Sequence, residues 1–242
     1  MRAVSASETL PFKPKRVLAI GAHPDDIEFF AGATVAALRD AGAEVVMGIC
    51  TDGSRGGRGL DDAAAVRRAE QQRAAAVLGV GEWIWLAYPD GSLTAGDPLR
   101  GDLVCAVRRV RPELVLAHDP QTLWTRVGEI AHPGHSDHRA AGQATLDAIY
   151  PRSASPNFHP EHLGGEGALK PWYPREVWLF DTAQPDLRID ASDGFARKQA
   201  SLLAHASQEE AAGGLVAGAR ALGAHWGSAE RPAEAFVRLR LY

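Results

Sequence analysis

The first stretch of the sequence whose side chains could do chemistry is GAHPDDIE, directly after the apolar run RVLAI. His23, Asp25 and Asp26 place one imidazole beside two adjacent carboxylates. In a loop these groups can converge on one centre, and zinc accepts both donor types at about 2.0–2.2 Å. The alternative is a helix N-cap with a second carboxylate that complements the helix dipole. The spacing of this stretch alone leaves metal binding and helix capping both open.

The second stretch is HPGHSDH at 132–138, which holds three of the nine histidines in the chain and an aspartate. Ser136 or Asp137 could cap the helix that follows, which would put His138 in its first turn and His135 just before it. Three protein ligands with an open fourth position are typical of catalytic zinc, whereas structural sites are closed and often contain cysteine. Neither cysteine is near either stretch. The alternative is a solvated, His-rich loop, which a second His/Asp group elsewhere in the chain disfavours.

Short apolar runs alternate with amphipathic segments over the first two thirds of the chain. The pattern predicts strands at 16–22, 44–51, 82–88 and 113–118, and helices at 29–42, 61–79, 98–112 and 136–150. Continuous apolar strands separated by helices are typical of βαβ units in a parallel sheet. We therefore expect an α/β fold of Rossmann-like type, with a mostly parallel sheet and helices on both faces.

Polar side chains follow each predicted strand of this sheet. They are His23, Asp25 and Asp26 after the first strand, Asp52 after the second, Asp90 after the third, and His118 and Asp119 after the fourth. Ligands of such sheets bind beyond the carboxyl ends of the strands, near a switch in strand order. The sequence therefore predicts a functional site at this edge.

The alternation of strands and helices weakens in the last third of the chain. Residues 151–175 are rich in Pro, Gly and His, and we expect a long loop that shapes substrate choice. A C-terminal extension follows, with strands predicted at 175–182, 187–192 and 234–242 and a helix at 193–210. We expect one domain over residues 1–242, with a flexible leader at 1–15.

Composition sets the class of protein. A formal net charge of −4 and a pI near 6.1 give no reason to expect nucleic acid or an anionic membrane as a partner. The first residues lack the apolar core of a signal peptide, and no later run reaches membrane-spanning length. Cys50 and Cys105 each lie in an apolar stretch, as buried thiols do in a reducing compartment. We expect a soluble, cytoplasmic protein.

AHPDDIE at 22–28 and HSDH at 135–138 together resemble the LmbE-like (PIG-L) superfamily of zinc-dependent de-N-acetylases. Further elements that fit the same succession are TDGSRGG at 51–57, Arg67 with Glu70, YPDG at 88–91, and Lys198 followed by His205, Ser207 and Gln208. The resemblance covers the chain from about residue 16 to about residue 210. It implies a hydrolase that removes an acyl group, most often acetyl, from an amino sugar such as N-acetylglucosamine or its conjugate.

The resemblance also implies roles at the metal. His23, Asp26 and His138 would bind one Zn²⁺ per chain, or another divalent metal. Asp25 would be the general base that deprotonates the attacking water. A divalent metal lowers the pKa of bound water, and an adjacent carboxylate can take the proton.

Other residues receive roles from the same resemblance. His135 would stabilise the oxyanion or protonate the leaving amine, and Asp137 would hold a histidine in its working tautomer. Arg67 and Asp90 would contact the substrate, while the extra His132 would be a loop residue near the pocket. Similar enzymes often assemble as trimers or hexamers, so a homo-oligomer is possible.

Two other classes of function remain open from the sequence. One is a zinc amidase that cleaves a thiol conjugate or another amide with the same machinery. The other is a metal-binding protein without catalysis. A dinucleotide-binding module is disfavoured, because the first strand is followed by GAHPDD and not by G-x-G-x-x-G.

Overall fold

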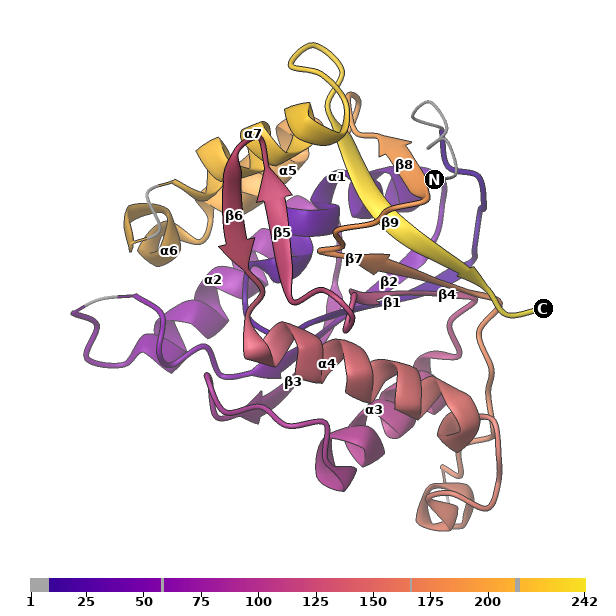
Figure 1. Cartoon of the computed structure of the whole chain (residues 1–242). Helices are drawn as coiled ribbons and strands as arrows, with labels where there is room; N and C mark the ends of the chain where they lie inside the picture. The colour runs from indigo at the N-terminus through magenta and orange to yellow at the C-terminus, as the bar shows by residue number, and fades with distance from the viewer. Residues whose placement is uncertain (1–8, 58, 166, 212–213) are drawn as a thin grey trace.

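The computed structural model describes residues 9–57, 59–165, 167–211 and 214–242. Its centre is a seven-stranded sheet of order β3-β2-β1-β4-β7-β9-β8, and a separate two-stranded hairpin is formed by β5 and β6 (Figure 1). The strands are β1 (Arg16–Gly21), β2 (Glu44–Thr51), β3 (Glu82–Tyr88), β4 (Leu114–His118), β5 (Trp124–Val127), β6 (Ile130–Pro133), β7 (Glu176–Phe180), β8 (Leu187–Asp190) and β9 (Ala233–Arg240).

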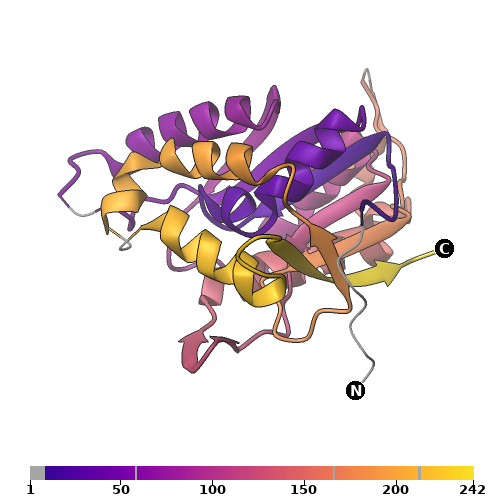
Figure 2. The same ribbon diagram turned by 90° about the horizontal axis from the view of Figure 1, so that it is seen from above.

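Helices cover both faces of the sheet (Figures 1 and 2). The helices are α1 (Asp26–Asp40), α2 (Ala63–Val77), α3 (Asp97–Val110), α4 (Ser136–Asp147), α5 (Phe195–Leu203), α6 (Ala206–Ala211) and α7 (Leu215–Trp226), with short helical segments η1 (Ala148–Ser153) and η2 (Pro160–Leu163). Helices α1, α2 and α5 pack together on one face, whereas α3 and α4 pack together on the other.

The strand directions confirm the predicted α/β fold. Strands β3, β2, β1, β4 and β7 pair in parallel, whereas β9 pairs antiparallel with both β7 and β8 and forms the C-terminal extension. The chain builds outward from β1 to β3 and then returns to add β4 on the other side of β1. The strand order therefore reverses between β1 and β4, and the crevice at their carboxyl ends is where such sheets bind ligands.

Strand β1 shows how its sequence serves two cores. Val17 and Ala19 belong to the apolar cluster on the α1 side, whereas Leu18 and Ile20 belong to the cluster on the α3 and α4 side. Successive side chains of a strand point to opposite faces. An apolar residue is therefore needed at each of positions 17–20, which explains the continuous run VLAI.

The predicted boundaries hold closely for the central elements, whereas three features of the chain's second half differ. The helix expected at 193–210 is broken into α5 and α6 around Ala204 and His205. Helix α7 and the β5–β6 hairpin were not predicted. The hairpin turn is Gly128-Glu129, and Gly128 has a φ of 61°, a value that two-residue hairpin turns require and glycine adopts without strain.

The long loop that we expect to shape substrate choice is anchored near the amino end of β4, not at the carboxyl ends of the strands. The Trp172 indole N–H donates to the carbonyl of Pro112 at 2.7 Å, just before the amino end of β4. The Arg108 guanidinium, near the end of α3, donates to carbonyls of the same loop, including that of Phe158 at 2.8 Å. The β5–β6 hairpin, in contrast, follows the carboxyl end of β4 and leads into α4. The hairpin therefore lies at the same end of the sheet as the switch point.

The expected leader divides in two. Residues 1–8 lie outside the described residues. Leu10 and Phe12 pack against the apolar cluster on the α1 side, so this part of the segment is held against the core.

Candidate active site

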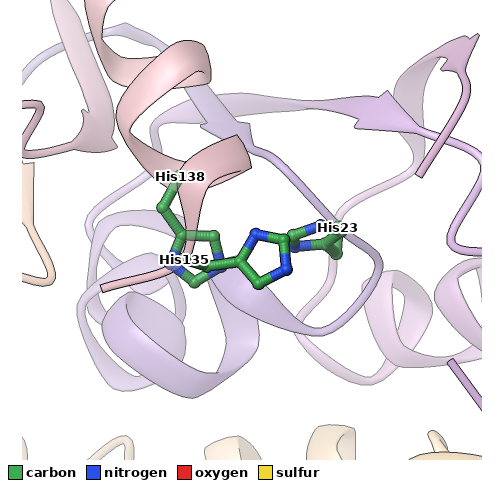
Figure 3. A group of neighbouring side chains, drawn as sticks. All are labelled: His23, His135 and His138. Atoms are coloured by element: carbon green, nitrogen blue, oxygen red, sulfur yellow. The ribbon is translucent and has the colours of Figure 1, made fainter. Parts of the chain in front are cut away.

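The two sequence stretches meet at the switch point. His23 and Asp25 lie between β1 and α1, Asp26 opens α1, His135 caps α4 and His138 lies in the first turn of α4. Figure 3 shows His23, His135 and His138 grouped together, with His138 carried by the helix. One ligand atom from each of these three histidines lies within 4.8 Å of the others.

Asp26 stands between the two histidines that the sequence predicts as ligands. Its Oδ2 is 3.5 Å from Nδ1 of His23, and its Oδ1 is 3.2 Å from Nε2 of His138. Two atoms that each bind a tetrahedral metal at about 2.1 Å lie about 3.4 Å apart. Each separation therefore suits a pair of ligands on one divalent metal, while the sets whose ligand atoms all lie within 4.8 Å of one another join His138 either to His23 and His135 or to Asp26 and His118.

The remaining nitrogen of each of these histidines is held by carboxylates. Nε2 of His23 is 3.2 Å from Asp90 and 3.3 Å from Asp137, and Nδ1 of His138 is 2.8 Å from Asp181. Metal-bound histidines usually bond through their second nitrogen to such a carboxylate, which fixes the ring. The arrangement leaves Nδ1 of His23 and Nε2 of His138 facing Asp26, so the residues fit a bound metal.

The charges around the histidines favour a cation at the same place. Burial would lower the pKa of His23, but hydrogen bonds to Asp137, Asp26 and Asp90 outweigh it and raise that pKa to about 12. Burial would likewise lower the pKa of His138, which Asp26 and Asp181 raise to about 9. Without a metal, the surrounding carboxylates therefore favour the protonated forms of His23 and His138. A dication satisfies the same need for positive charge.

Asp137 behaves as an orienting residue, and its own carboxylate is firmly placed. It is fully buried and accepts the backbone N–H of Gly91 at 2.7 Å and of Leu93 at 3.2 Å. The histidine that it holds is His23, through Nε2. Asp90, for which we predicted a substrate contact, also faces His23 and is 6% exposed.

Two residues of the site received no role from the sequence, although the sequence places His118 at this edge. Asp181 follows β7 and holds His138. His118, which ends β4, is fully buried, with Nε2 3.0 Å from Asp26 and its ring 4.0 Å from that of His138. The signal was present in both cases, because each polar residue stands at the carboxyl end of a buried apolar strand.

Asp25 has the properties expected of a general base. It precedes α1 with a φ of 100°, a left-handed conformation that non-glycine residues adopt rarely and that clusters at functional sites. Its N–H donates to the side chain of Gln71 at 3.2 Å, and its Oδ2 accepts from Arg67 at 3.1 Å. Burial raises the pKa of Asp25 to about 7, despite the opposing charge of Arg67. A carboxylate with a pKa near neutrality can exchange a proton with water.

Arg67 is buried beneath the glycine-rich loop and bonds to the base. Its side chain is 5% exposed and also donates to the carbonyls of Pro24 at 2.6 Å and Gly53 at 3.0 Å. A Cβ at Gly56 would lie 2.4 Å from the guanidinium, which explains why glycine stands there. In this structure Arg67 positions Asp25, and its contact with substrate stays a prediction.

His135 lies beside His23 and His138, and its Nε2 has no hydrogen-bond partner among the described residues. Its Nδ1 accepts the N–H of Asp137 at 3.1 Å, so His135 itself is the N-cap that we had assigned to Ser136 or Asp137. Burial and the neighbouring His23 and His138 lower the pKa of His135. A neutral imidazole that accepts at Nδ1 carries its proton on Nε2, so Nε2 can donate a hydrogen bond.

The fold and the site together define a Rossmann-like α/β protein with a candidate His/Asp metal site at its switch point. Residues 18–149 match the family described as GlcNAc-PI de-N-acetylase (PIG-L), and the chain belongs to this family.

Individual relatives share most of the chain. A diacetylchitobiose deacetylase from Thermococcus kodakarensis is 34% identical over 198 residues, which cover 80% of this chain and 70% of the relative. A mycothiol S-conjugate amidase from Streptomyces coelicolor is 28% identical over 249 residues, with 82% and 84% covered. The solved N,N'-diacetylchitobiose deacetylase from Pyrococcus horikoshii superposes with a TM-score of 0.82 at 29% identity and covers 94% of this chain and 84% of that one. Among the described residues, no helix is both long and apolar enough to cross a membrane.

Proposed function

We propose that this protein is a metal-dependent N-deacetylase that hydrolyses the N-acyl amide of an amino sugar, with N-acetylglucosamine or its conjugate as the substrate class. The observation that carries the proposal is the pairing of two oriented histidines around Asp26 with a second carboxylate, Asp25, whose pKa lies near neutrality. The names of relatives that release acetyl groups from chitobiose support the choice of substrate.

The metal site consists of His23, Asp26 and His138 in this proposal. Imidazole and carboxylate donors suit zinc among the divalent metals, although availability in the cell also decides which metal is bound. We propose one Zn²⁺ per chain. When bound, the metal supplies a Lewis acid that acidifies water and polarises the amide carbonyl.

The side chains around the metal divide the remaining chemistry. Asp25, held by Arg67 and Gln71, takes a proton from the attacking water while the water oxygen bonds to the carbonyl carbon. His135 donates from Nε2 to the carbonyl oxygen as negative charge develops there, or to the leaving nitrogen. The C–N bond then breaks, the nitrogen leaves as an amine with the transferred proton, and the acyl group leaves as a carboxylic acid.

The test joins turnover with metal content. Wild-type protein is expected to hold about one zinc per chain and to release acetate from N-acetylglucosamine or diacetylchitobiose. Asp25→Asn keeps the ligands and removes the base, so we expect the metal to stay while kcat falls about 10²–10⁴-fold. Metal-loaded wild-type protein that releases no acetate from any N-acetyl amino sugar contradicts the proposal.

Two alternatives are resolved by the same samples. Cleavage of a mycothiol S-conjugate without acetate release would assign the chain to the amidases, as the Streptomyces coelicolor relative suggests. Bound metal without any hydrolysis would leave a metal-binding protein. Assembly as a trimer or hexamer and a cytoplasmic location stay predictions, which the molar mass in solution and cell fractionation can check.

A further inference from the structure

A cavity of about 470 Å³ opens beside the site. His135 and His138 line one end of it, while Phe29, Phe30 and Leu222 contribute to its apolar walls. The ring of Phe30 lies 6.0 Å from that of His138, so the apolar wall begins at the candidate metal site itself. The cavity lies between α1, α7 and the β5–β6 hairpin, elements that Figure 1 shows close together.

The cavity lies on one side of the site, and the polar groups lie on the other. Asp25, Arg67 and Asp90 are absent from its described lining. These three residues form a charged wall with each other and with His23. A substrate amide at the metal therefore has a polar surface on one side and an apolar cavity on the other.

The buried ion pair in the cavity lining is already satisfied, while the exposed Arg126 lines the hairpin side of the cavity. Nζ of Lys198 is 2.6 Å from Oε1 of Glu234, and both side chains are 2% exposed. Glu234 also accepts the backbone N–H groups of Ala33 and Thr34 at 3.0 and 2.7 Å. Sugar hydroxyls placed against this surface would lose hydrogen bonds to water without an adequate replacement. The cavity therefore suits hydrocarbon, and we place the sugar toward Arg67 and Asp90, for which the sequence predicts substrate contacts.

Building on the proposed function, we infer that this cavity binds the acyl group of the substrate and that the enzyme prefers acyl chains longer than acetyl. Water adds to the amide carbonyl carbon, the C–N bond breaks, and the products are a free fatty acid in the cavity and the amino sugar at the polar wall. The proton taken from water leaves on the amine. An acetyl group fills a small part of the cavity, so its walls gain contacts with each added methylene.

A series of N-acyl glucosamines from acetyl to octanoyl tests the inference through release of free amine. Full burial of a methylene corresponds to a gain of about fourfold. We expect kcat/KM to rise by up to about fourfold per methylene and to level off once the cavity is filled. A steady fall of kcat/KM from acetyl onward overturns the inference while leaving the deacetylase function intact. A protein that releases no amine from any member contradicts the proposed function instead.

A substitution in α7 links the preference to this cavity. Ala221 lines the cavity, so Ala221→Trp is expected to lower the ratio of hexanoyl to acetyl kcat/KM at least tenfold. Ala217, one helical turn earlier, is also exposed and lies outside the described lining, which makes Ala217→Trp the matched control with an unchanged ratio. Thermal unfolding verifies that both variants are folded, and Ala221→Leu gives a milder version of the same change.

A second copy of the chain in the cavity would give a different result with the same variant. If the cavity receives a second copy of the chain instead, Ala221→Trp changes the molar mass in solution and leaves the hexanoyl-to-acetyl ratio as it is in the wild type. That result overturns the inference.

Discussion

The described part of the chain contains two compact groups of histidines and carboxylates that differ in their surroundings. A second group, called the η2 group, consists of His159, which precedes η2, and Glu161 and His162 on it. Their ligand atoms lie as close together as those at the switch point. Nδ1 of His159 is 3.0 Å from Glu161, a separation similar to those around Asp26. Spacing alone therefore does not distinguish the two groups.

The difference lies in what holds each group. Around Asp26, the second nitrogen of both histidines meets a carboxylate, and the Asp26 side chain is 6% exposed. In the η2 group, Nε2 of His159 and Nδ1 of His162 are buried with no hydrogen-bond partner in the described structure, and Glu161 is 64% exposed.

A positive charge also stands beside the η2 group. The Arg108 guanidinium donates to the carbonyl of His159 at 3.0 Å. A nearby cation, an exposed carboxylate and histidine nitrogens without orienting partners all disfavour a dication. The comparison shows that a metal site is defined by its supporting residues as much as by its ligands.

The largest effect is expected from removal of a proposed ligand at the switch point. His138→Ala removes the Nε2 donor that faces Asp26, so we expect the metal content to fall from about one per chain to near zero and acetate release to fall to background. Elemental analysis and acetate release on the purified variant measure both. Retention of stoichiometric metal would remove His138 from the ligand set.

The second-largest expected effect concerns a residue that orients a proposed ligand. Asp181→Asn removes the carboxylate charge beside Nδ1 of His138 but leaves every proposed ligand in place. We therefore expect metal affinity or activity to fall about 10–100-fold. Competition with a chelator gives the affinity. Asp186→Asn, an exposed aspartate in the same connection between β7 and β8, is the matched control with unchanged affinity. Equal affinities for the two variants would contradict the orienting role of Asp181.

A buried histidine whose neighbouring carboxylate, on Glu28, is 3.9 Å away and beyond hydrogen-bond distance sharpens the comparison through pH. His205 is fully buried, neither of its ring nitrogens is bonded within the described part of the chain, and burial lowers its pKa to about 3. Between pH 3 and 6.5 the unfolded state therefore binds more protons at this residue, and the free energy of unfolding falls as pH falls. The stability that His205 contributes as a neutral buried residue is fully present above pH 6.5. Below that pH it is lost by at most about 1.4 kcal/mol per pH unit.

The measurement is a pair of denaturant titrations across that pH range on metal-free protein. His205→Gln is expected to lose stability less steeply than the wild type as pH falls. His225→Gln, at an exposed position on α7, is expected to keep the wild-type slope. Identical slopes for all three proteins would contradict the lowered pKa of His205.

The smallest expected effect is at η2. Replacing His159 and His162 together by alanine is expected to leave the metal content and acetate release unchanged, because this group lacks the support of the first. A drop in bound metal, or a wild-type content of two metal ions per chain, would show that the η2 group also binds metal.

The central sheet was predictable because its local signals agree with its tertiary structure. The run VVMGIC is buried on both faces as β2, and EWIWLAY forms β3, each with the boundaries expected. The C-terminal region was harder. The break at Ala204 and His205 and the β5–β6 hairpin arise in short segments, where few residues carry the periodicity.

The sequence by itself determined which residues approach the switch point, because an apolar strand followed by polar residues fixes the edge at which their side chains emerge. It thereby determined the group of His23, Asp25, Asp26, His135 and His138. Tertiary structure alone decided that Asp137 and Asp90 hold His23, that Asp181 holds His138 and that Arg67 turns toward Asp25. Such contacts join residues 42 to 114 positions apart, for which no local pattern exists. Their geometry depends on how strands and helices pack, and packing is a property of the whole fold.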